Sequence, residues 1–269
     1  MHPSRRLNRD AKRGPNAKRG PDGKRGPEAR SPVQITQDHF PGFFDRFPRF
    51  EDSSSVSSDL SRLNFRAHMI IGRNRALIEG RRLLDLACHD ARFTMAALVD
   101  GGAAHVTGIE ARADVAQAGR DNLAHYDIGA DRANIITGDI FAEIDRLERG
   151  AFDTVMCLGI LYHTARQYEL ARSISQLGAQ AVIIDSAVLP DTDEPIVQLK
   201  WEGTAKDGAV WDATRDKVLS AVPSAAALVC YFEEFGYRVT VLQPDVAVPM
   251  KARVYARGQR VTMVAIKEV

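Results

Sequence analysis

The sequence predicts an α/β fold with a doubly wound, seven-stranded and mostly parallel sheet, and two observations carry this prediction. From residue 82 onward, short runs rich in Leu, Val and Ile alternate with segments of helical periodicity, as in parallel sheets covered on both faces. Three successive strands also end in an acid, namely Asp85, Glu110 and Asp139. The spacing of about 25 residues between the first two is the length of one βα unit. Because parallel strands end at one edge of the sheet, these acids are expected to share a nucleotide-type pocket.

The composition is that of one globular domain with appendages. With 269 residues, of which 45% are hydrophobic, the chain can bury a full core. No apolar run approaches the roughly 18 residues of a transmembrane helix, and the charged N-terminus lacks the hydrophobic segment of a secretory signal. The three cysteines are far apart and form no CxxC pair, so we expect a cytoplasmic protein without a structural metal or a membrane contact.

Residues 1–32 differ in charge from the rest of the chain. They hold ten Lys or Arg residues against three acidic ones, a charge of +7, which leaves −6 for the remainder of the net +1. KRGP occurs three times with a six-residue period, and Gly and Pro disfavour both helix and strand. A disordered basic arm is therefore expected. It could make weak contact with nucleic acid, or it could be a solvated extension, which the absence of aromatic residues favours.

Residues 33–80 are expected to form an N-terminal cover with a helix. Five phenylalanines between residues 40 and 50 could cover a ligand pocket, form a contact in an oligomer, or pack as a satellite core. Apolar residues then recur at helical spacing from Asp59 to Gly80, and a glycine suits a helix terminus.

Residues 81–269 are expected to form the main domain, in which strands and helices alternate. The predicted strands are 82–88, 104–109, 134–138, 152–158 and 180–186, and the helices between and after them are 90–100, 112–125, 140–149 and 165–177. Residues 187–222 show no clear period and are interpreted as a substrate-side insertion. A helix over 223–237 and two strands, 238–243 and 259–267, follow, and the strands are expected to close the sheet as an antiparallel hairpin.

Four motifs in this region resemble those of one enzyme family. They are the segment Asp85–Ala91, the acid Glu110, the pair Asp139-Ile140, and FDTVMCLGILYH at residues 152–163. Over about residues 60–268 the chain resembles class I S-adenosylmethionine-dependent methyltransferases, which have a Rossmann-like fold. The LYH sequence and a later PSxxAL…GY segment are similar to the branch that includes the tRNA uridine-5-oxyacetic acid methyltransferase-like proteins.

The resemblance implies S-adenosylmethionine as the cofactor, and the chemistry of each residue agrees with a role in binding it. A carboxylate at Glu110 can accept both ribose hydroxyls. Asp139 can accept the adenine amino group, and the backbone N–H of Ile140 can meet a ring nitrogen. Asp85 suits the ammonium group of the methionine moiety, and Leu158 and Ala111 could enclose the adenine ring. Any one of these acids could instead be a helix cap or turn residue.

The first motif departs from the family at its three glycines, which are Ala87, His89 and Ala91 here. Glycine allows close backbone approach and positive φ, so His89 narrows the pocket or points into it. It could contact the carboxylate or ribose of the cofactor, or cap the following helix. A dinucleotide would need its pyrophosphate against this turn, whereas S-adenosylmethionine has no phosphate, so the latter is favoured over NAD.

His163 follows the fourth strand, where acceptor and methyl group would meet, with Tyr162 beside it. His163 is the candidate general base, although it could be a hydrogen-bonded structural histidine. From the insertion, Trp201, Trp211, Glu202 and Asp212 could line the acceptor pocket, although Trp more often packs in a lid. From the leading helix, three residues could reach the carboxylate of the cofactor: Arg62, Asn64 and Arg66.

Three functions are compatible with these features. The first is methyl transfer to a small-molecule acceptor, favoured because the insertion could enclose it and the domain is acidic. The second is methylation of RNA with the help of the basic arm, against which the acidic domain argues. The third is a non-catalytic, cofactor-binding relative, suggested by His89 and the missing glycines.

Overall fold

The computed structural model describes residues 33–52, 59–203 and 216–268. The predicted disordered arm, residues 1–32, lies outside these ranges, as do Trp211 and Asp212. In the part of the chain that is described, no helix has the length and apolar character needed to span a membrane.

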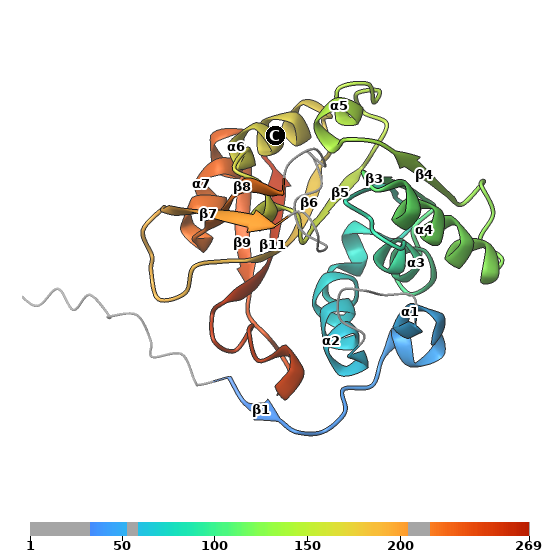
Figure 1. Cartoon of the computed structure of the whole chain (residues 1–269), viewed down its shortest axis with the longest axis horizontal. Coiled ribbons are helices and arrows are strands. Elements are labelled where there is room, and N and C mark those ends of the chain that lie inside the picture. Colours follow the sequence, from blue (N-terminus) through green and yellow to red (C-terminus); the bar gives the residue numbers. More distant parts are fainter. Residues whose placement is uncertain (1–32, 53–58, 204–215, 269) are drawn as a thin grey trace, which may run out of the picture. The chain divides into compact units, whose positions relative to one another are not determined.

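Within the described residues, seven strands form one sheet in the order β4-β3-β2-β5-β6-β11-β9, which we call the main sheet (Figure 1). Neighbouring strands from β4 to β6 are parallel, and β11 is antiparallel to both β6 and β9. The predicted sheet and its antiparallel C-terminal strand are confirmed. The strands are β2 (Arg82–Leu86), β3 (His105–Glu110), β4 (Ala133–Thr137), β5 (Thr154–Leu158), β6 (Ala181–Ala187), β9 (Tyr237–Leu242) and β11 (Arg260–Lys267).

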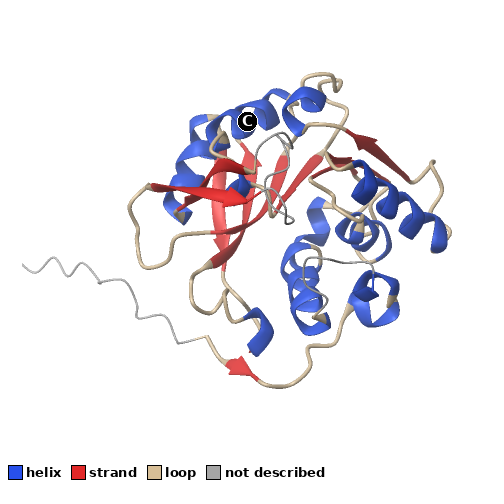
Figure 2. Cartoon of the chain, viewed as in Figure 1, coloured by secondary structure: helices blue, strands red, loops and turns tan. Residues whose placement is uncertain are grey.

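Helices cover both faces of the main sheet, as Figure 2 shows. On one face, a hydrophobic cluster joins Leu83 and Val106 to residues of the N-terminal helices, α3 and α4. On the other face, Leu84 and Ile109 pack with residues of α5, α6 and α7. Adjacent strand residues therefore point to opposite faces, so the sheet is doubly wound. The helices are α3 (Arg92–Val99), α4 (Ala113–His125), α5 (Ile140–Ile144), α6 (Gln167–Gln176) and α7 (Ala225–Glu234).

The predicted helix over 59–80 is shorter in the structure. Helix α2 (Leu60–Ile70) begins where the Asp59 side chain accepts a hydrogen bond from the Arg62 amide. It ends where the side-chain amide of Asn74 donates to the carbonyls of Met69 and Ile70. These contacts replace the next helical hydrogen bonds, and a 3₁₀-helix, η2 (Gly72–Leu77), follows.

The phenylalanines of residues 40–50 pack inside the protein. Phe43, Phe44 and Phe50 are buried in the same cluster as Leu83, and the ring of Phe44 meets that of Phe93 edge-on. These rings line no part of the pocket described below. Of the alternatives above, the one in which they cover a ligand pocket is therefore wrong. The shorter elements here and elsewhere are β1 (Ile35–Thr36), η1 (Phe43–Arg46), α1 (Arg49–Asp52), η3 (Leu161–His163), β10 (Val248–Pro249) and η4 (Met250–Ala252).

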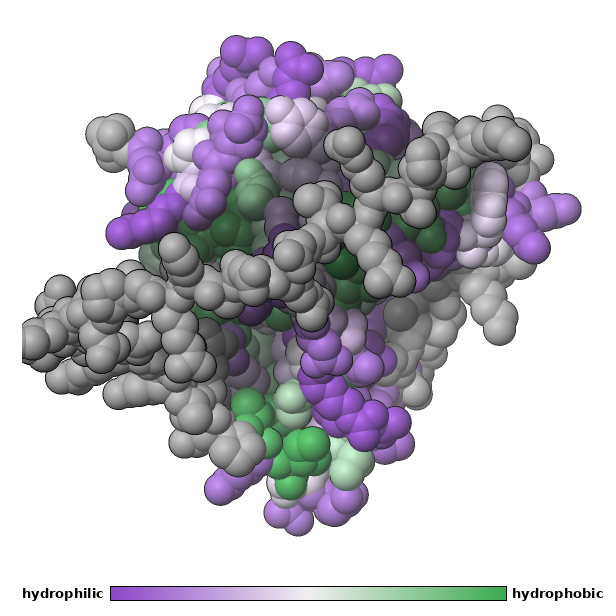
Figure 3. Space-filling view, turned by 90° about the vertical axis from the view of Figure 1, so that its left-hand side faces the viewer, coloured by the Kyte–Doolittle hydropathy of each residue, from purple (hydrophilic) through white to green (hydrophobic). Residues whose placement is uncertain are grey.

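The predicted insertion contains a hairpin that the sequence reading missed. Strands β7 (Val197–Gly203) and β8 (Lys217–Pro223) pair antiparallel. The alternation in VQLKWEG could have revealed β7. Two apolar residues of β7, Leu199 and Trp201, are exposed. Figure 3 shows one face of the molecule, where hydrophobic residues lie in a hollow between hydrophilic margins. Helix α7 starts at Ala225 rather than at 223, because the Ser224 hydroxyl accepts a hydrogen bond from the Ala227 amide.

Two further predicted bounds are corrected. Helix α5 ends at Ile144, not at 149, and β5 begins at Thr154, not at 152. Neither change moves the residues at the carboxyl ends of the strands. The order of strands reverses beside β2, which has β3 on one side and β5 on the other. In open α/β sheets a crevice opens at such a reversal, outside the carboxyl ends of the strands.

Candidate active site

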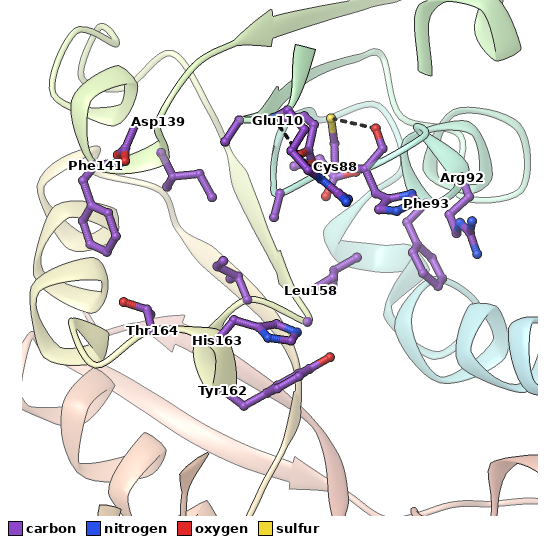
Figure 4. A pocket seen from close by; sticks show the side chains of 18 of the residues that line it. Cys88, Arg92, Phe93, Glu110, Asp139, Phe141, Leu158, Tyr162, His163 and Thr164 are labelled. Carbon is purple, nitrogen blue, oxygen red and sulfur yellow. Dashed lines mark hydrogen bonds and ion pairs between the residues drawn. The ribbon is translucent and has the colours of Figure 1, made fainter. Parts of the chain in front are cut away.

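A pocket lies at this reversal, and all the predicted cofactor residues and both candidate catalytic residues line it. The residues come from the loops after β2, β3, β4 and β5, and Figure 4 shows Glu110 and Cys88 at one end with Tyr162 and His163 at the other. The predicted residues that line the pocket are Asp85, Ala87, His89, Glu110, Ala111, Asp139, Ile140, Leu158, Tyr162 and His163. Four successive loops of the α/β pattern thus reach one cavity.

The turn after β2 keeps a glycine-like backbone without glycine. Ala87, His89 and Ala91 have φ values of 56°, 54° and 64°. These are the three positions at which the sequence motif lacks its glycines. A left-handed conformation costs a residue with a Cβ roughly 1–2 kcal/mol. The replacement of glycine therefore changes the side chains in the turn while the path of the backbone is kept.

The ring of His89 is a buried polar group without a hydrogen bond. Among the described residues, neither ring nitrogen has a hydrogen-bond partner, although Nδ1 lies 3.3 Å from Oδ1 of Asp90. The predicted alternative in which His89 caps the next helix is wrong, because the residue before α3 is Ala91 and no side chain caps that helix. The Asp90 carboxylate lies beside Nδ1, so Nε2 is the buried nitrogen that is left for a ligand group.

Glu110 is buried and holds two parts of the pocket wall together. One carboxylate oxygen accepts a hydrogen bond from the His89 amide at 3.1 Å, and the other accepts one from the Arg112 amide at 3.1 Å. Nε of Arg112 also donates to the second of these oxygens, Oε1, at 3.4 Å. Each carboxylate oxygen has two lone pairs, so Oε2 is the oxygen that keeps an acceptor site for a hydroxyl group.

Asp85 is a buried carboxyl group with little compensation. Burial raises its pKa to about 7, a hydrogen bond from the Thr94 hydroxyl at 2.7 Å opposes this rise, and the charge of Glu110 adds to it. The ionised form therefore lacks a cation. A positively charged ligand group at this point would stabilise the carboxylate.

Asp139 has a structural role beside its predicted one. Its Oδ1 accepts hydrogen bonds from the amides of Phe141 at 2.7 Å and Ala142 at 3.3 Å, so the residue caps α5. Its Oδ2 accepts no hydrogen bond from the described residues. The amide of Ile140 belongs to the first turn of α5, where N–H groups have no partner inside the helix.

His163 forms a hydrogen-bonded pair with Glu202 of the hairpin. Its Nδ1 lies 3.0 Å from both carboxylate oxygens of Glu202, and the Tyr162 ring is 4.1 Å away, centroid to centroid. Burial lowers the pKa of His163 and outweighs the opposing effect of Glu202. The imidazole is therefore neutral near pH 7, with its proton on Nδ1, so Nε2 is left as a proton acceptor.

The other predicted side chains divide into three groups. Arg66 lines the pocket, and Glu202 reaches it through His163. Asn64 instead holds the N-terminal segment, because its side chain bonds the Phe44 amide and the Phe40 carbonyl. Trp201 is 70% exposed and does not line the pocket, so that hypothesis is wrong.

An arginine network at the end of β6 was not predicted. The buried Asp185 accepts hydrogen bonds at Oδ1 from Arg66 at 2.7 Å and from Arg260 at 2.5 Å. At Oδ2 it accepts them from Tyr255 and Thr262. The carboxylate has a lowered pKa, because these arginines and hydrogen bonds outweigh its burial. The acid at the end of the predicted strand 180–186 was the signal, but its partners lie 70 or more residues away in the chain.

Comparisons with known proteins agree with this geometry. Residues 83–179 match the model of a family described as a methyltransferase domain. A search of curated proteins found no match. Solved structures with similar folds include the N-terminal domain of EvdMO1 in the presence of SAH and D-fucose, with 16% identity over 75% of this chain and 82% of that one (TM-score 0.56).

Two other structures widen the range of functions on this fold. The [4+2]-cyclase SpnF is 13% identical over 80% of this chain and 85% of its own, with a TM-score of 0.56. The methyltransferase domain of bacterial CtHen1-C is 14% identical over 77% of this chain and all of its own, with a TM-score of 0.53. At these identities the structures establish the fold alone. The family match covers the strands that carry Asp85, Glu110 and Asp139, so residues 83–179 are similar to a methyltransferase domain, and the described part of the chain has the fold of these solved methyltransferases.

Proposed function

We propose that the chain methylates a hydroxyl group of a small molecule, with His163 as the general base. The observation that carries this proposal is the His163–Glu202 pair, which lies in the same pocket as the three strand-end acids. A neutral imidazole held by a carboxylate is suited to an acceptor that must lose a proton. An acceptor that is already an anion would need no such base.

The pocket residues fit S-adenosylmethionine. The buried carboxyl of Asp85 has no cationic partner among the described residues, and the ammonium group would supply one. Oε2 of Glu110 has a free acceptor site for a ribose hydroxyl. Asp139 Oδ2 and the Ile140 amide suit the adenine edge, between Leu158 and Ala111. Nε2 of His89, which has no hydrogen-bond partner among the described residues, suits a ribose hydroxyl or the methionine carboxylate. When bound, the cofactor supplies a methyl group on a sulfonium centre that is already activated for displacement.

The protein's own contribution is orientation and proton transfer. His163 Nε2 accepts the proton of the acceptor hydroxyl as its oxygen becomes the nucleophile. Glu202, hydrogen-bonded to Nδ1, stabilises the imidazolium that forms and keeps the ring in one orientation. Such a base typically contributes about 10²–10⁴-fold to the rate. The buried surroundings of the pair exclude water from the reacting groups.

A small acceptor is favoured over RNA. The sequence outside residues 1–32 carries a charge of −6, which opposes a polyanion at the pocket. The EvdMO1 domain, which shares the fold, was solved with SAH and D-fucose, a small molecule rich in hydroxyl groups. The basic arm on which an RNA substrate would depend lies outside the described residues.

The test is a screen of hydroxylated small molecules for release of S-adenosylhomocysteine (SAH), repeated with His163→Gln and Glu202→Gln. We expect the first variant to lose most of the turnover while SAH still binds, and the second to lose less. Truncation of residues 1–32 should leave this activity unchanged. A wild-type rate in His163→Gln would show that His163 is not the general base. Activity on RNA alone would refute a small-molecule acceptor.

A further inference from the structure

The acceptor end of the pocket holds more positive than negative charge. Among the described residues, Arg66 and Arg260 both pair with Asp185, and neither has a second acidic partner. Arg62 has no acidic partner in the part of the chain that the structure describes. Burial lowers its pKa, and repulsion from Arg66 and Arg260 lowers it further. Two guanidinium groups thus share the one carboxylate of Asp185, and the positive charge of a third lies close enough to repel them.

Asp185 cannot neutralise these arginines. Its second oxygen is occupied by the hydroxyl groups of Tyr255 and Thr262, and the side chain is fully buried. A buried charge without a partner is costly, and the surplus here faces a cavity because Arg66 and Arg260 line the pocket. An anion entering the pocket would remove this cost.

A second observation points to the same spot. Gly159, directly after β5, has a φ of 81°, and a Cβ built on it would lie 3.6 Å from the Tyr162 hydroxyl and 3.7 Å from Nη2 of Arg260. A hydroxyl donor and a guanidinium donor therefore converge on one point of the pocket wall, which glycine leaves open. The Arg260 guanidinium also lies 5.6 Å from the centroid of the Tyr162 ring.

We propose that Arg260, Arg66 and Tyr162 form an anion-binding subsite for a carboxylate or phosphate group of the acceptor molecule. This proposal rests on the proposed function, because the same molecule would present its hydroxyl group to His163. Tyr162 and His163 are adjacent in η3, so a short acceptor can reach both the subsite and the base. Arginine suits either anion because its planar guanidinium group can donate two parallel hydrogen bonds.

The methionine carboxylate is a less suitable occupant. Asp85, which suits the ammonium group, lies on β2, and Asp185 lies two strands away on β6. Neighbouring strands are about 4.8 Å apart, so the two acids are separated by roughly 10 Å along the sheet edge. The ammonium and carboxylate groups of one amino acid share a carbon atom. An anion at the Arg260 end is therefore supplied more readily by a second molecule than by the cofactor.

The experiment uses the full chain saturated with SAH and titrates it with inorganic phosphate and with acetate in a low-salt buffer. Phosphorus NMR linewidths follow phosphate, and the thermal midpoint follows both anions. We expect saturable binding that Arg260→Gln and Arg66→Gln weaken about tenfold or more, as for a lost charge-assisted hydrogen bond. Arg46→Gln, which removes an exposed arginine paired with Asp100, is the matched control and should bind as the wild type does.

A second variant keeps the test valid if the arginine variants fold poorly. Tyr162→Phe removes a single hydroxyl and leaves the Asp185 network intact, and it should weaken phosphate binding a few-fold. The proposal is overturned if the wild type shows no saturable binding, or if Tyr162→Phe and a folded arginine variant bind phosphate as the wild type does.

Two further arms separate the sources of the anion and the two proposals. Methylthioadenosine lacks the amino acid part of SAH. If Arg260→Gln weakens SAH but not methylthioadenosine, the subsite binds the cofactor and the acceptor assignment is overturned. His163→Gln should bind phosphate normally, so normal turnover of that variant would refute the general base and leave the subsite standing.

Discussion

The two ends of the pocket are built in different ways. The cofactor end consists of acids at or just after the carboxyl ends of three strands that are consecutive in the chain, namely Asp85, Glu110 and Asp139. The acceptor end combines residues from α2, η3, the hairpin and β11, which the chain brings together from distant positions. The first end is acidic and suits the cationic cofactor, whereas the second has a surplus of arginine. In the proposed function, this difference in charge assigns the cofactor and the acceptor to separate ends of the cavity.

The largest expected effect is on the rate of methyl transfer and concerns the acceptor end of the pocket. His163→Gln should lower kcat by about 10²–10⁴-fold, because the variant cannot accept the proton of the acceptor. The measurement is initial-rate kinetics of SAH release with an acceptor from the hydroxyl screen. Tyr168→Phe, on the exposed surface of α6, is the control and should keep the wild-type rate. A His163→Gln rate within a factor of two of wild type would contradict the assignment.

The next effect concerns the cofactor end. Glu110→Ala should weaken SAH binding by about 10–100-fold, because a ribose hydroxyl loses a charged acceptor. Isothermal titration calorimetry measures this change. Glu79→Ala removes an exposed glutamate that pairs with Arg75 and should leave the affinity unaltered. Equal affinities for Glu110→Ala and wild type would show that the ribose lies elsewhere.

A smaller effect depends on pH. Because the pKa of Asp85 is raised to about 7, its neutral form predominates at lower pH, and the ammonium group of a ligand favours the ionised form. SAH affinity should therefore fall as the pH drops below about 7, by at most about tenfold per pH unit for one proton. Calorimetry between about pH 5 and about pH 8, an interval that includes this pKa, tests the expected fall in affinity. An equally steep profile in Asp85→Asn would assign the proton to another group.

The same pKa predicts a change in stability without ligand. A carboxyl whose pKa is raised on folding stabilises the protein fully below its unfolded value of 3.8 and loses this contribution as the pH rises through about 7. The free energy of unfolding of wild type relative to Asp85→Asn should therefore decline over that interval. Urea denaturation at several pH values measures the difference, and a pH-independent difference would speak against a buried, uncompensated Asp85.

The smallest effect concerns the backbone of the turn after β2. Ala87→Gly should raise the free energy of unfolding by about 1 kcal/mol, because glycine adopts positive φ without strain. Ala118→Gly, in the middle of α4, should lower it by about 1 kcal/mol. Urea denaturation compares the two. Destabilisation by both substitutions would mean that the Ala87 methyl group packs more favourably than its backbone strain costs.

The contrast between the two ends also explains what the sequence could predict. Strand periodicity and strand-end acids are local signals, so the main sheet and the lining of the pocket by Asp85, Glu110 and Asp139 followed from them. The arginine network depends on a pairing between Asp185 and Arg260, which are far apart in the chain. No periodicity encodes such a contact.

The hairpin of β7 and β8 was missed for another reason. Its alternating pattern is present in VQLKWEG, but the apolar side chains Leu199 and Trp201 lie exposed, against the usual rule for a strand. Glu202, on the opposite face of β7, is the residue that orients His163. The functional side chain was therefore recognisable only once the strand was placed.

The division of the pocket is tested most directly by calorimetric titration of SAH into wild type, Glu110→Ala and His163→Gln. We predict that SAH affinity drops at least about tenfold in Glu110→Ala, as for a lost charged acceptor, and stays at the wild-type value in His163→Gln. The opposite pattern, or an equal loss in both variants, would contradict the account, because the cofactor would then depend on the end assigned to the acceptor.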